Sequence, residues 1–202
     1  QRQMCIRDRV WTDNVDPYKK RKVRILNGAH TSMVLAARMY GLETVGECMK
    51  DEKVVSILKK AVFEEIIPAI GDTEDNRNFG NAVFERFANP FIRHQLLSIA
   101  LNSVSKSRAR VLPTILEFKE QRGRYPQILS FSLAALIAFY KTDEANDSEE
   151  IIEFMKEASV ADILKREDYW GEDISFLYDI VNTWFEKIEK DGVAACYDEL
   201  LK

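Results

Sequence analysis

A lysine, an asparagine and a histidine near the start of the chain have the types and the spacing to act together on a substrate. Lys22, Asn27 and His30 fall within the stretch YKKRKVRILNGAH. Asn27 and His30 are three residues apart, so they are neighbours on a helix surface. On an ideal α-helix with 3.6 residues per turn, Lys22 and Asn27 differ by about 140°. Convergence of all three groups on a substrate therefore requires a bend, and Gly28 is well placed to permit one.

Two other interpretations of this stretch compete with a substrate site. Its five basic residues, at positions 19–22 and 24, could form a nucleic-acid patch. We disfavour this, because the chain has a net charge of −4 and only Tyr18 supplies an aromatic ring nearby. The third interpretation is a solvated helix start capped by Asn27. In that case His30 would be a core histidine with one hydrogen-bonded nitrogen.

The elements that must position these groups are predicted to be helices throughout. Apolar residues recur at spacings of three and four, and sustained alternation is hard to find, so the sequence predicts an all-α chain. The helix at 127–140 is apolar around its whole circumference and should be buried at the centre. Pro90 suits a first helical turn, and Pro113 should kink or restart its helix. We expect helices over 31–40, 51–67, 73–87, 90–104, 105–121, 127–140, 148–157, 160–166, 174–189 and 193–201.

Composition excludes several classes of protein. The 202 residues, 46% hydrophobic and 31% charged, suit one ordinary soluble domain or two small ones. The longest uncharged apolar run, Ile128 to Tyr140, has 13 residues, short of the roughly 20 that span a bilayer. Three cysteines without a Cys-x-x-Cys pair indicate a reducing compartment, and with two histidines they make a zinc site implausible. The eight glycines form no Gly-x-Gly pair, so the chain contains neither a dinucleotide fingerprint nor a phosphate loop.

The two ends of the chain differ in character. Residues 1–9, QRQMCIRDR, fit no helix or strand period, and we expect them to be a non-native leader before a single domain over 10–202. Residues 1–140 hold 22 basic and 15 acidic side chains, a net of +7, whereas residues 141–202 hold 7 and 18, a net of −11. The basic excess could face an anionic ligand.

Several segments together carry a family resemblance. The pattern Lys-x4-Asn-x2-His at 22–30 resembles the signature of the long-chain mannitol dehydrogenases, which are metal-independent, NAD(P)-linked polyol and sugar-acid dehydrogenases. The segments RFANPFIRH at 86–94 and SIALNSVSK at 98–106 look like that family's second substrate-side region. The sequence of these segments is most similar to that of one branch of the family, the altronate oxidoreductases (tagaturonate reductases). Its blocks here are VWTDNVDPY, ILNGAHTSMV, FEEIIPAI, NPFIRHQLLSIALNSVSK, RVLP and FSLAALIAFY.

The resemblance implies a fold, a reaction and partners. The fold would be the multi-helical C-terminal substrate domain of a two-domain dehydrogenase, like that of 6-phosphogluconate dehydrogenase, with the N-terminal Rossmann domain absent. The implied reaction is NAD-dependent hydride transfer between D-altronate and D-tagaturonate, in cytoplasmic hexuronate catabolism. The partners would be a small sugar acid and the missing Rossmann domain, which binds most of the NAD, with no metal, nucleic acid or membrane. Without that domain, the fragment should be inactive.

The resemblance also implies a role for each site residue. Lys22 would be the general acid/base, with burial and the cations at 19–21 and 24 lowering its pKa. Asn27 and His30 would donate hydrogen bonds to the reacting oxygen or its neighbour. Lys106 would bind the substrate carboxylate or a terminal hydroxyl. Further candidates for substrate binding are Arg93, His94 and Ser98.

Some alternatives stay open at this level. Arg108 and Arg110, like Arg93, could form a fork for a carboxylate, although each is more readily explained as a structural or surface arginine. Ser98 stands where polyol dehydrogenases typically carry an arginine, which disfavours mannitol as the substrate. A mannonate (fructuronate) or mannitol oxidoreductase of the same family, or a non-catalytic helical binding module, are the competing functions.

Overall fold

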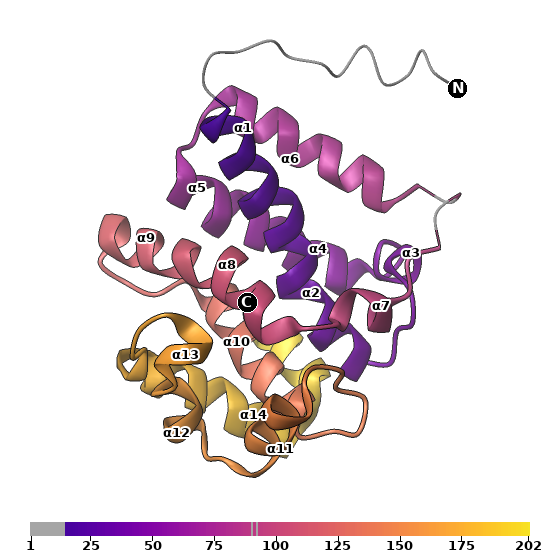
Figure 1. Cartoon of the computed structure of the whole chain (residues 1–202). Helices are drawn as coiled ribbons and strands as arrows, with labels where there is room; N and C mark the ends of the chain where they lie inside the picture. Colours follow the sequence, from indigo (N-terminus) through magenta and orange to yellow (C-terminus); the bar gives the residue numbers. More distant parts are fainter. Residues whose placement is uncertain (1–14, 90, 92) are drawn as a thin grey trace.

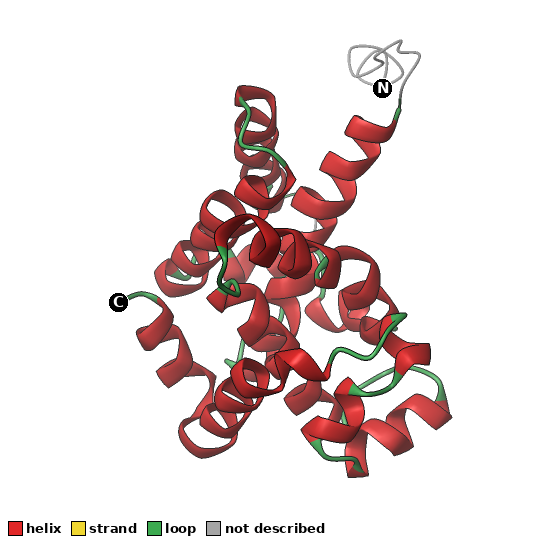
Figure 2. Cartoon of the chain, turned by 90° about the vertical axis from the view of Figure 1, so that its left-hand side faces the viewer, coloured by secondary structure: helices red, strands yellow, loops and turns green. Residues whose placement is uncertain are grey.

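The computed structural model describes residues 15–89, 91 and 93–202. The expected leader at 1–9 and the expected helix start at Pro90 lie outside the described residues. Within the described part every regular element is a helix, and short loops join the helices (Figure 2). The described residues also contain one isolated antiparallel bridge, between Thr44 and Gln95. The all-α prediction is therefore confirmed. None of the helices described combines the length and the apolar composition needed to cross a membrane.

The first half of the chain forms one long rod and several shorter helices around it (Figure 1). Its elements are α1 (Asp16–Arg21), the π-helical turn η1 (Lys22–Asn27), α2 (Gly28–Met39), α3 (Val45–Cys48), α4 (Glu52–Lys60), the π-helical turn η2 (Ala61–Ile66), α5 (Ile67–Ile70), α6 (Glu74–Phe87), α7 (Leu96–Ala100), α8 (Ser103–Arg110) and α9 (Leu112–Arg122).

The rod consists of α1, η1 and α2 in direct succession. The helix predicted at 31–40 therefore begins earlier and has no N-terminal break. Gly28 has helical angles, φ −64° and ψ −46°, so the bend expected there is absent. Its lack of a side chain serves packing instead, because a Cβ at Gly28 would lie 3.4 Å from the carbonyl oxygen of Arg110. Glycine thus lets α2 and α8 approach closely.

Two prolines shape the neighbouring helices in different ways. The helix predicted at 51–67 continues past Pro68 to Ile70, where Gly71 ends it at φ 115°. A proline inside a helix lacks an N–H and crowds the carbonyl four residues before it. Here the wider turn η2 comes directly before α5, with Pro68 at the start of that short helix. Pro113 lies in the first turn of α9, as its predicted restart requires.

The helix predicted at 90–104 is confirmed only at 96–100 and 103–104, and the other described residues of this segment are not helical. Residues 93–95 are not helical, because Leu96 donates its N–H to Glu43 (2.8 Å) and His94 accepts from Val45 (3.0 Å). These contacts hold the segment extended along residues 43–45. After the short α7, Asn102 adopts a left-handed conformation with φ 51°. It thereby redirects the chain into α8, and both helices pack against α2.

The second half begins with the buried central helix and ends with a long kinked one. Its elements are α10 (Gln127–Tyr140), α11 (Glu149–Glu157), α12 (Val160–Leu164), α13 (Glu167–Trp170), the 3-10 turn η3 (Ser175–Leu177) and α14 (Tyr178–Leu200). Gly192, at φ 79°, breaks α14 into two helical stretches, which matches the pair predicted at 174–189 and 193–201.

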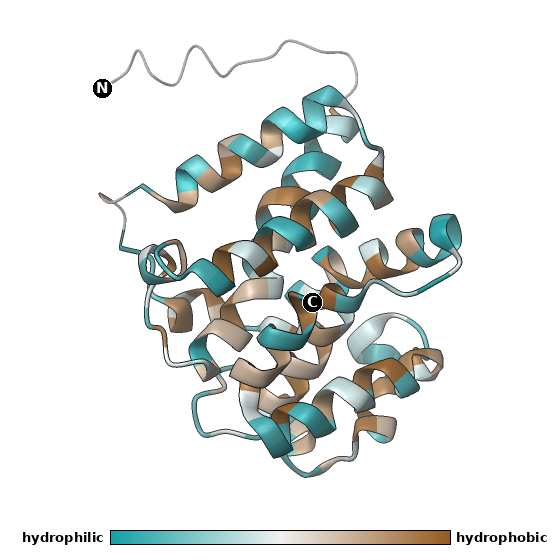
Figure 3. Ribbon diagram, turned by 180° about the vertical axis from the view of Figure 1, so that it is seen from behind, coloured by the Kyte–Doolittle hydropathy of each residue, from teal (hydrophilic) through white to brown (hydrophobic). Residues whose placement is uncertain are grey.

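The core gathers around α10, which is buried from Ile128 to Tyr140 and packs against both α2 and α14. The outer helices instead mix hydrophilic and hydrophobic turns (Figure 3). The N-terminus of α10 is capped by a buried carboxylate from η2. Glu65 accepts the N–H groups of Ile128 and Leu129, each at 2.9 Å. The core thus holds α2 rigidly, and α2 carries the predicted site.

Candidate functional site

The three predicted residues lie on or directly after a π-helical turn of the rod. Lys22 and Asn27 are the first and last residues of η1. In a π-turn the backbone pairs residue i with i+5, so residues five apart lie near the same face. Asn27 and His30 are neighbours across the start of α2. The wide turn is therefore the feature that could replace the bend expected at Gly28, and the convergence of the three groups stays a prediction.

Lys22 is exposed on this rod. Two carboxylates offset part of the positive charge around it. Lys20 and Arg24 pair with Glu117, at 3.1 and 3.0 Å, and Arg21 pairs with Asp75 at 3.3 Å. The described chain alone thus supplies no burial of Lys22, and it offsets part of the positive charge expected around it. Its role as a general acid/base stays a prediction.

Asn27 is half-buried and makes no capping hydrogen bond. The helix runs straight through this position, so the interpretation of Asn27 as an N-cap is wrong. A capping side chain needs free N–H groups at a helix start, and here those groups belong to a continuous helix. The amide is therefore not used to begin α2.

His30 is held in a partly buried stack. Its ring lies on Phe87 at the end of α6, with the ring centroids 3.8 Å apart and the planes 7° from parallel. Burial, and then the positive charges of His94 and Arg110, lower the pKa of His30 to about 4. The imidazole is therefore neutral near pH 7. Its Nε2 is buried without a hydrogen-bond partner among the described residues, which in a folded protein needs an explanation such as a ligand or water.

Two cations lie on α8, and the charge of one of them, Arg110, acts on this histidine. The Arg110 guanidinium donates from Nη1 to the Thr31 hydroxyl at 3.2 Å, next to His30 in the chain. Lys106, one turn earlier on α8, donates from Nζ to the carbonyl of Ile99 at 2.8 Å. Burial lowers the pKa of both groups, and Arg110 lowers that of Lys106 further. The site thus combines a neutral imidazole with two partly dehydrated cations.

The other predicted residues surround this group more loosely. His94 is exposed in the loop before α7, and its ring centroid lies 6.4 Å from that of His30. Ser98 is exposed on α7. Arg93 is exposed and lines a cleft of about 380 Å³ together with Glu47, whose pKa it helps to lower after the backbone N–H groups of Glu43 and Thr44. Within the described residues, no hydrogen bond or ion pair joins Ser98 or Arg93 to Lys22, Asn27 or His30.

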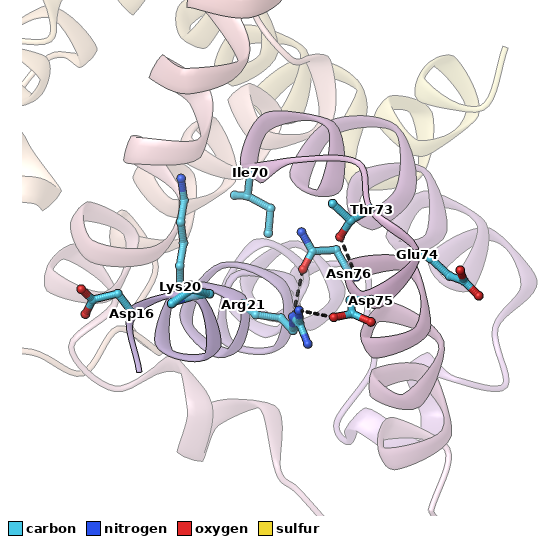
Figure 4. Close-up of a pocket in the computed structure, with 9 residues that line it drawn as sticks. Asp16, Lys20, Arg21, Ile70, Thr73, Glu74, Asp75 and Asn76 are labelled. Carbon is cyan, nitrogen blue, oxygen red and sulfur yellow. Dashed lines mark hydrogen bonds and ion pairs between the residues drawn. The ribbon is translucent and has the colours of Figure 1, made fainter. Parts of the chain in front are cut away.

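A larger cleft lies away from these residues. It has a volume of about 720 Å³ and opens between α1 and the connection from α5 to α6. Arg21 bridges it, with hydrogen bonds to Asn76 (2.9 Å) and Asp75 (3.3 Å) that Figure 4 shows as dashed lines. None of the predicted site residues lines this cleft, and no sequence motif pointed to it.

The described residues do not form a nicotinamide dinucleotide site. Such sites lie at the carboxyl ends of parallel strands, with a glycine-rich turn at the pyrophosphate. The described chain has no such strand and no Gly-x-Gly pair. Among the same residues, no three His, Cys, Asp or Glu side chains gather as metal ligands would.

The sequence itself decides the family. A sequence model of the mannitol dehydrogenase C-terminal domain matches residues 14–190. The chain belongs to this family. It is 52% identical over 130 residues to the altronate oxidoreductase of Yersinia enterocolitica, covering 64% of this chain and 27% of that protein. It is 40% identical over 197 residues to the altronate oxidoreductase of Yersinia pestis, covering 88% of this chain and 41% of that protein.

Solved structures show the same mannitol dehydrogenase fold. The ternary complex of Pseudomonas fluorescens mannitol 2-dehydrogenase with NAD and D-mannitol matches with a TM-score of 0.81 and 22% identity, over 94% of this chain and 42% of that one. A substrate-free D-sorbitol dehydrogenase matches with a TM-score of 0.77 and 20% identity, over 90% and 40%. The predicted multi-helical dehydrogenase domain is thus confirmed, and the chain spans less than half of each of these relatives.

Proposed function

We propose that this chain is the substrate-binding helical domain of an NAD-dependent oxidoreductase that interconverts D-altronate and D-tagaturonate. The observation that carries the proposal is the π-turn η1, which begins at Lys22, ends at Asn27 and is followed in the same rod by His30. This order supports an amine, an amide and an imidazole near one face. The names of the relatives support the sugar-acid substrate. NAD binding is assigned to a separate nucleotide-binding domain, because the described residues do not fit a dinucleotide.

Each side chain has a separate task in this proposal. Oxidation of the secondary alcohol removes a hydride from carbon, which NAD held by the nucleotide-binding domain would accept, and a proton from the hydroxyl oxygen. Lys22 takes that proton and returns it in the reverse direction. Lysine acts as a base only when neutral, and burial favours the neutral form. Since Lys22 is exposed here, the substrate and the nucleotide-binding domain must bury it.

Asn27 and His30 position the reacting oxygen. A neutral imidazole has one N–H donor and one acceptor nitrogen, and the low pKa of His30 keeps it in that form. Nε2 of His30 is already dehydrated and unpartnered in the described chain. A hydrogen bond to the substrate would therefore relieve an existing cost rather than add one.

The test is a substrate panel on the complete protein that carries this chain. NADH consumption should be fastest with D-tagaturonate, slower with D-fructuronate and slowest with D-fructose, when compared as kcat/KM. The 202-residue chain alone should consume no NADH and is the control for contaminating reductases. Equal or faster reduction of fructose would contradict the proposed substrate. No NADH consumption with any of the three would contradict the enzymatic function.

A further inference from the structure

Three arginines could meet a substrate carboxylate, and the structure separates them by their partners. Arg93 is exposed in a loop and faces Glu47. Arg108 donates from Nη1 to the carbonyl of Asp168 at 3.1 Å, and its guanidinium lies against Gly171, where a Cβ would come within 2.9 Å of Nη2. Arg108 therefore joins α8 to α13. The Arg110 guanidinium has neither a carboxylate nor a backbone carbonyl as a partner among the described residues.

Arg110 is a half-buried cation without an acidic partner. No carboxylate oxygen of the described residues lies within 4.0 Å of it, whereas Arg21, Arg24 and Arg38 all form such pairs. Burial lowers the pKa of Arg110, which reports the loss of hydration of its charged form. A dehydrated charge is costly unless a counter-charge is present. This position therefore favours binding of an anion.

The guanidinium is also oriented. Its Nη1 is engaged by the hydroxyl of Thr31, which is buried on α2. Among the described residues no hydrogen bond is made by the N–H groups of Nη2 and Nε, and two parallel N–H groups are what a carboxylate binds best. Thr31 follows His30 directly in α2, so the anion site and the imidazole share one stretch of helix.

The neighbouring lysine is less suited to this task. Nζ of Lys106 is already bonded to the carbonyl of Ile99, and the negative charge of Asp147 acts on it. A lysine presents a single point charge rather than a planar fork. Lys106 therefore adds positive charge to the site and can donate to a hydroxyl, while Arg110 is the better carboxylate ligand.

We propose that the Arg110 guanidinium, held by Thr31 beside His30, binds the carboxylate of a sugar-acid substrate. This assignment rests on the proposed function, since it names the substrate group that the same site recognises. It also explains why this chain would favour an acid over the corresponding polyol. Thr31 acts as a positioning residue through Arg110.

Binding to the 202-residue chain tests the assignment without any redox chemistry. D-Altronate and D-altritol share all their stereocentres and differ only in a carboxylate against a CH2OH group. Calorimetric titration, or NMR titration where binding is weak, should show altronate binding about 10- to 100-fold more tightly, the range expected for charged hydrogen bonds. Equal affinity for the two, or no saturable binding of altronate, would overturn the proposal.

Variants then identify the residues that produce the preference for altronate over altritol. Arg110→Met should abolish it, and Arg110→Lys should retain about a tenth of the tight binding, because it keeps the charge and loses the fork. Thr31→Val should weaken altronate binding about 3- to 10-fold, and Thr31→Ser should restore it, because the hydroxyl is the orienting group. Arg122→Met, which removes an exposed arginine on α9, controls for the change in net charge and should leave the preference intact.

The outcomes separate this inference from the proposed function. A preference that survives Arg110→Met in a folded protein overturns the role of Arg110, whatever the enzyme assay shows. A preference that depends on Arg110, with no tagaturonate reduction by the complete protein, keeps the carboxylate site and rejects the proposed reaction. Circular dichroism of each variant establishes folding, and should Arg110→Met be unfolded, Arg110→Lys and the Thr31 pair carry the same test.

Discussion

Lys22 and Asn27 are the first and last residues of a single π-helical turn. On an α-helix they would point about 140° apart, and the i→i+5 pairing of the π-turn instead places them near one face. Because α2 continues without a break, His30 extends the same face. Isolated π-turns inside α-helices occur often at functional sites. This turn provides the geometric basis of the proposed mechanism.

Lys22→Met should remove the proton-transfer group without unfolding the protein. We expect kcat for altronate oxidation by the complete protein to fall at least about 100-fold, the usual contribution of a positioned acid/base. The melting temperature should stay unchanged, because Lys22 is exposed. Lys59→Met, which removes an exposed lysine on α4, is the matched control and should keep its activity. Near-normal turnover in Lys22→Met would exclude Lys22 from the mechanism.

His30 should titrate far below an ordinary histidine. Its pKa is lowered to about 4 by burial and by the charges of His94 and Arg110, and an NMR titration of the ring should show this directly. His94→Gln removes one positive neighbour and should therefore raise the pKa of His30. A pKa of His30 near 6.5 in the folded protein would contradict the buried, neutral imidazole.

The same shift predicts how His30 affects stability. Between about pH 4 and 6.5, His30 is protonated in the unfolded chain and neutral in the folded protein. The free energy of unfolding therefore falls as the pH is lowered through this window. The loss is at most about 3 kcal/mol, because each pKa unit corresponds to about 1.4 kcal/mol. Urea unfolding of wild type and His30→Gln at pH 4.5, 5.5 and 7 should show a smaller acid loss in the variant.

Glu65 should produce the opposite pH dependence. Burial raises the pKa of Glu65 to about 7, although hydrogen bonds from the backbone N–H groups of Ile128 and Leu129 act in the opposite direction and lower it. Between about pH 4.5 and 7 the folded protein therefore holds a proton that the unfolded chain has lost, so this group costs stability as the pH rises. Relative to Glu65→Gln, the wild type should lose unfolding free energy across this window. Glu64→Gln, on the exposed neighbour, should show no such trend.

Gly171→Ala should destabilise the protein through two separable effects. Gly171 has φ 90°, and a Cβ there would lie 2.9 Å from Nη2 of Arg108. We expect a loss of about 1–3 kcal/mol from strain and displacement of the guanidinium. Gly123→Ala, at φ 70° with nothing within 4 Å, measures the strain alone. If chemical denaturation shows an equal loss of unfolding free energy at the two positions, the contact with Arg108 does not contribute to the effect of Gly171→Ala.

The spacing of apolar residues was sufficient to predict those helices that are determined by local sequence. The apolar circumference of 127–140 predicted the buried α10, because only a helix surrounded by others can bury every side. Pro113 acts through its fixed φ, and Gly192 acts through its freedom to adopt a positive φ, so the helix start and the break near them were also predictable.

The segment around His94 was not predictable in this way. Its apolar spacing favours a helix, yet residues 93–95 are extended, because Leu96 and His94 hydrogen-bond to the backbone of residues 43–45. Those partners are about fifty residues away in the chain. Local propensity is weak enough for such tertiary contacts to override it.

The sequence by itself determined the family, the helical class and the residue types available for chemistry at Lys22, Asn27 and His30. Only the tertiary structure decided how they are arranged. The stack of His30 on Phe87 and the partners of Arg24 and Arg110 depend on residues far apart in sequence. Arg24 reaches Glu117, and Arg110 reaches Thr31. A charged side chain's environment is set by what packs against it, and packing follows from the fold as a whole.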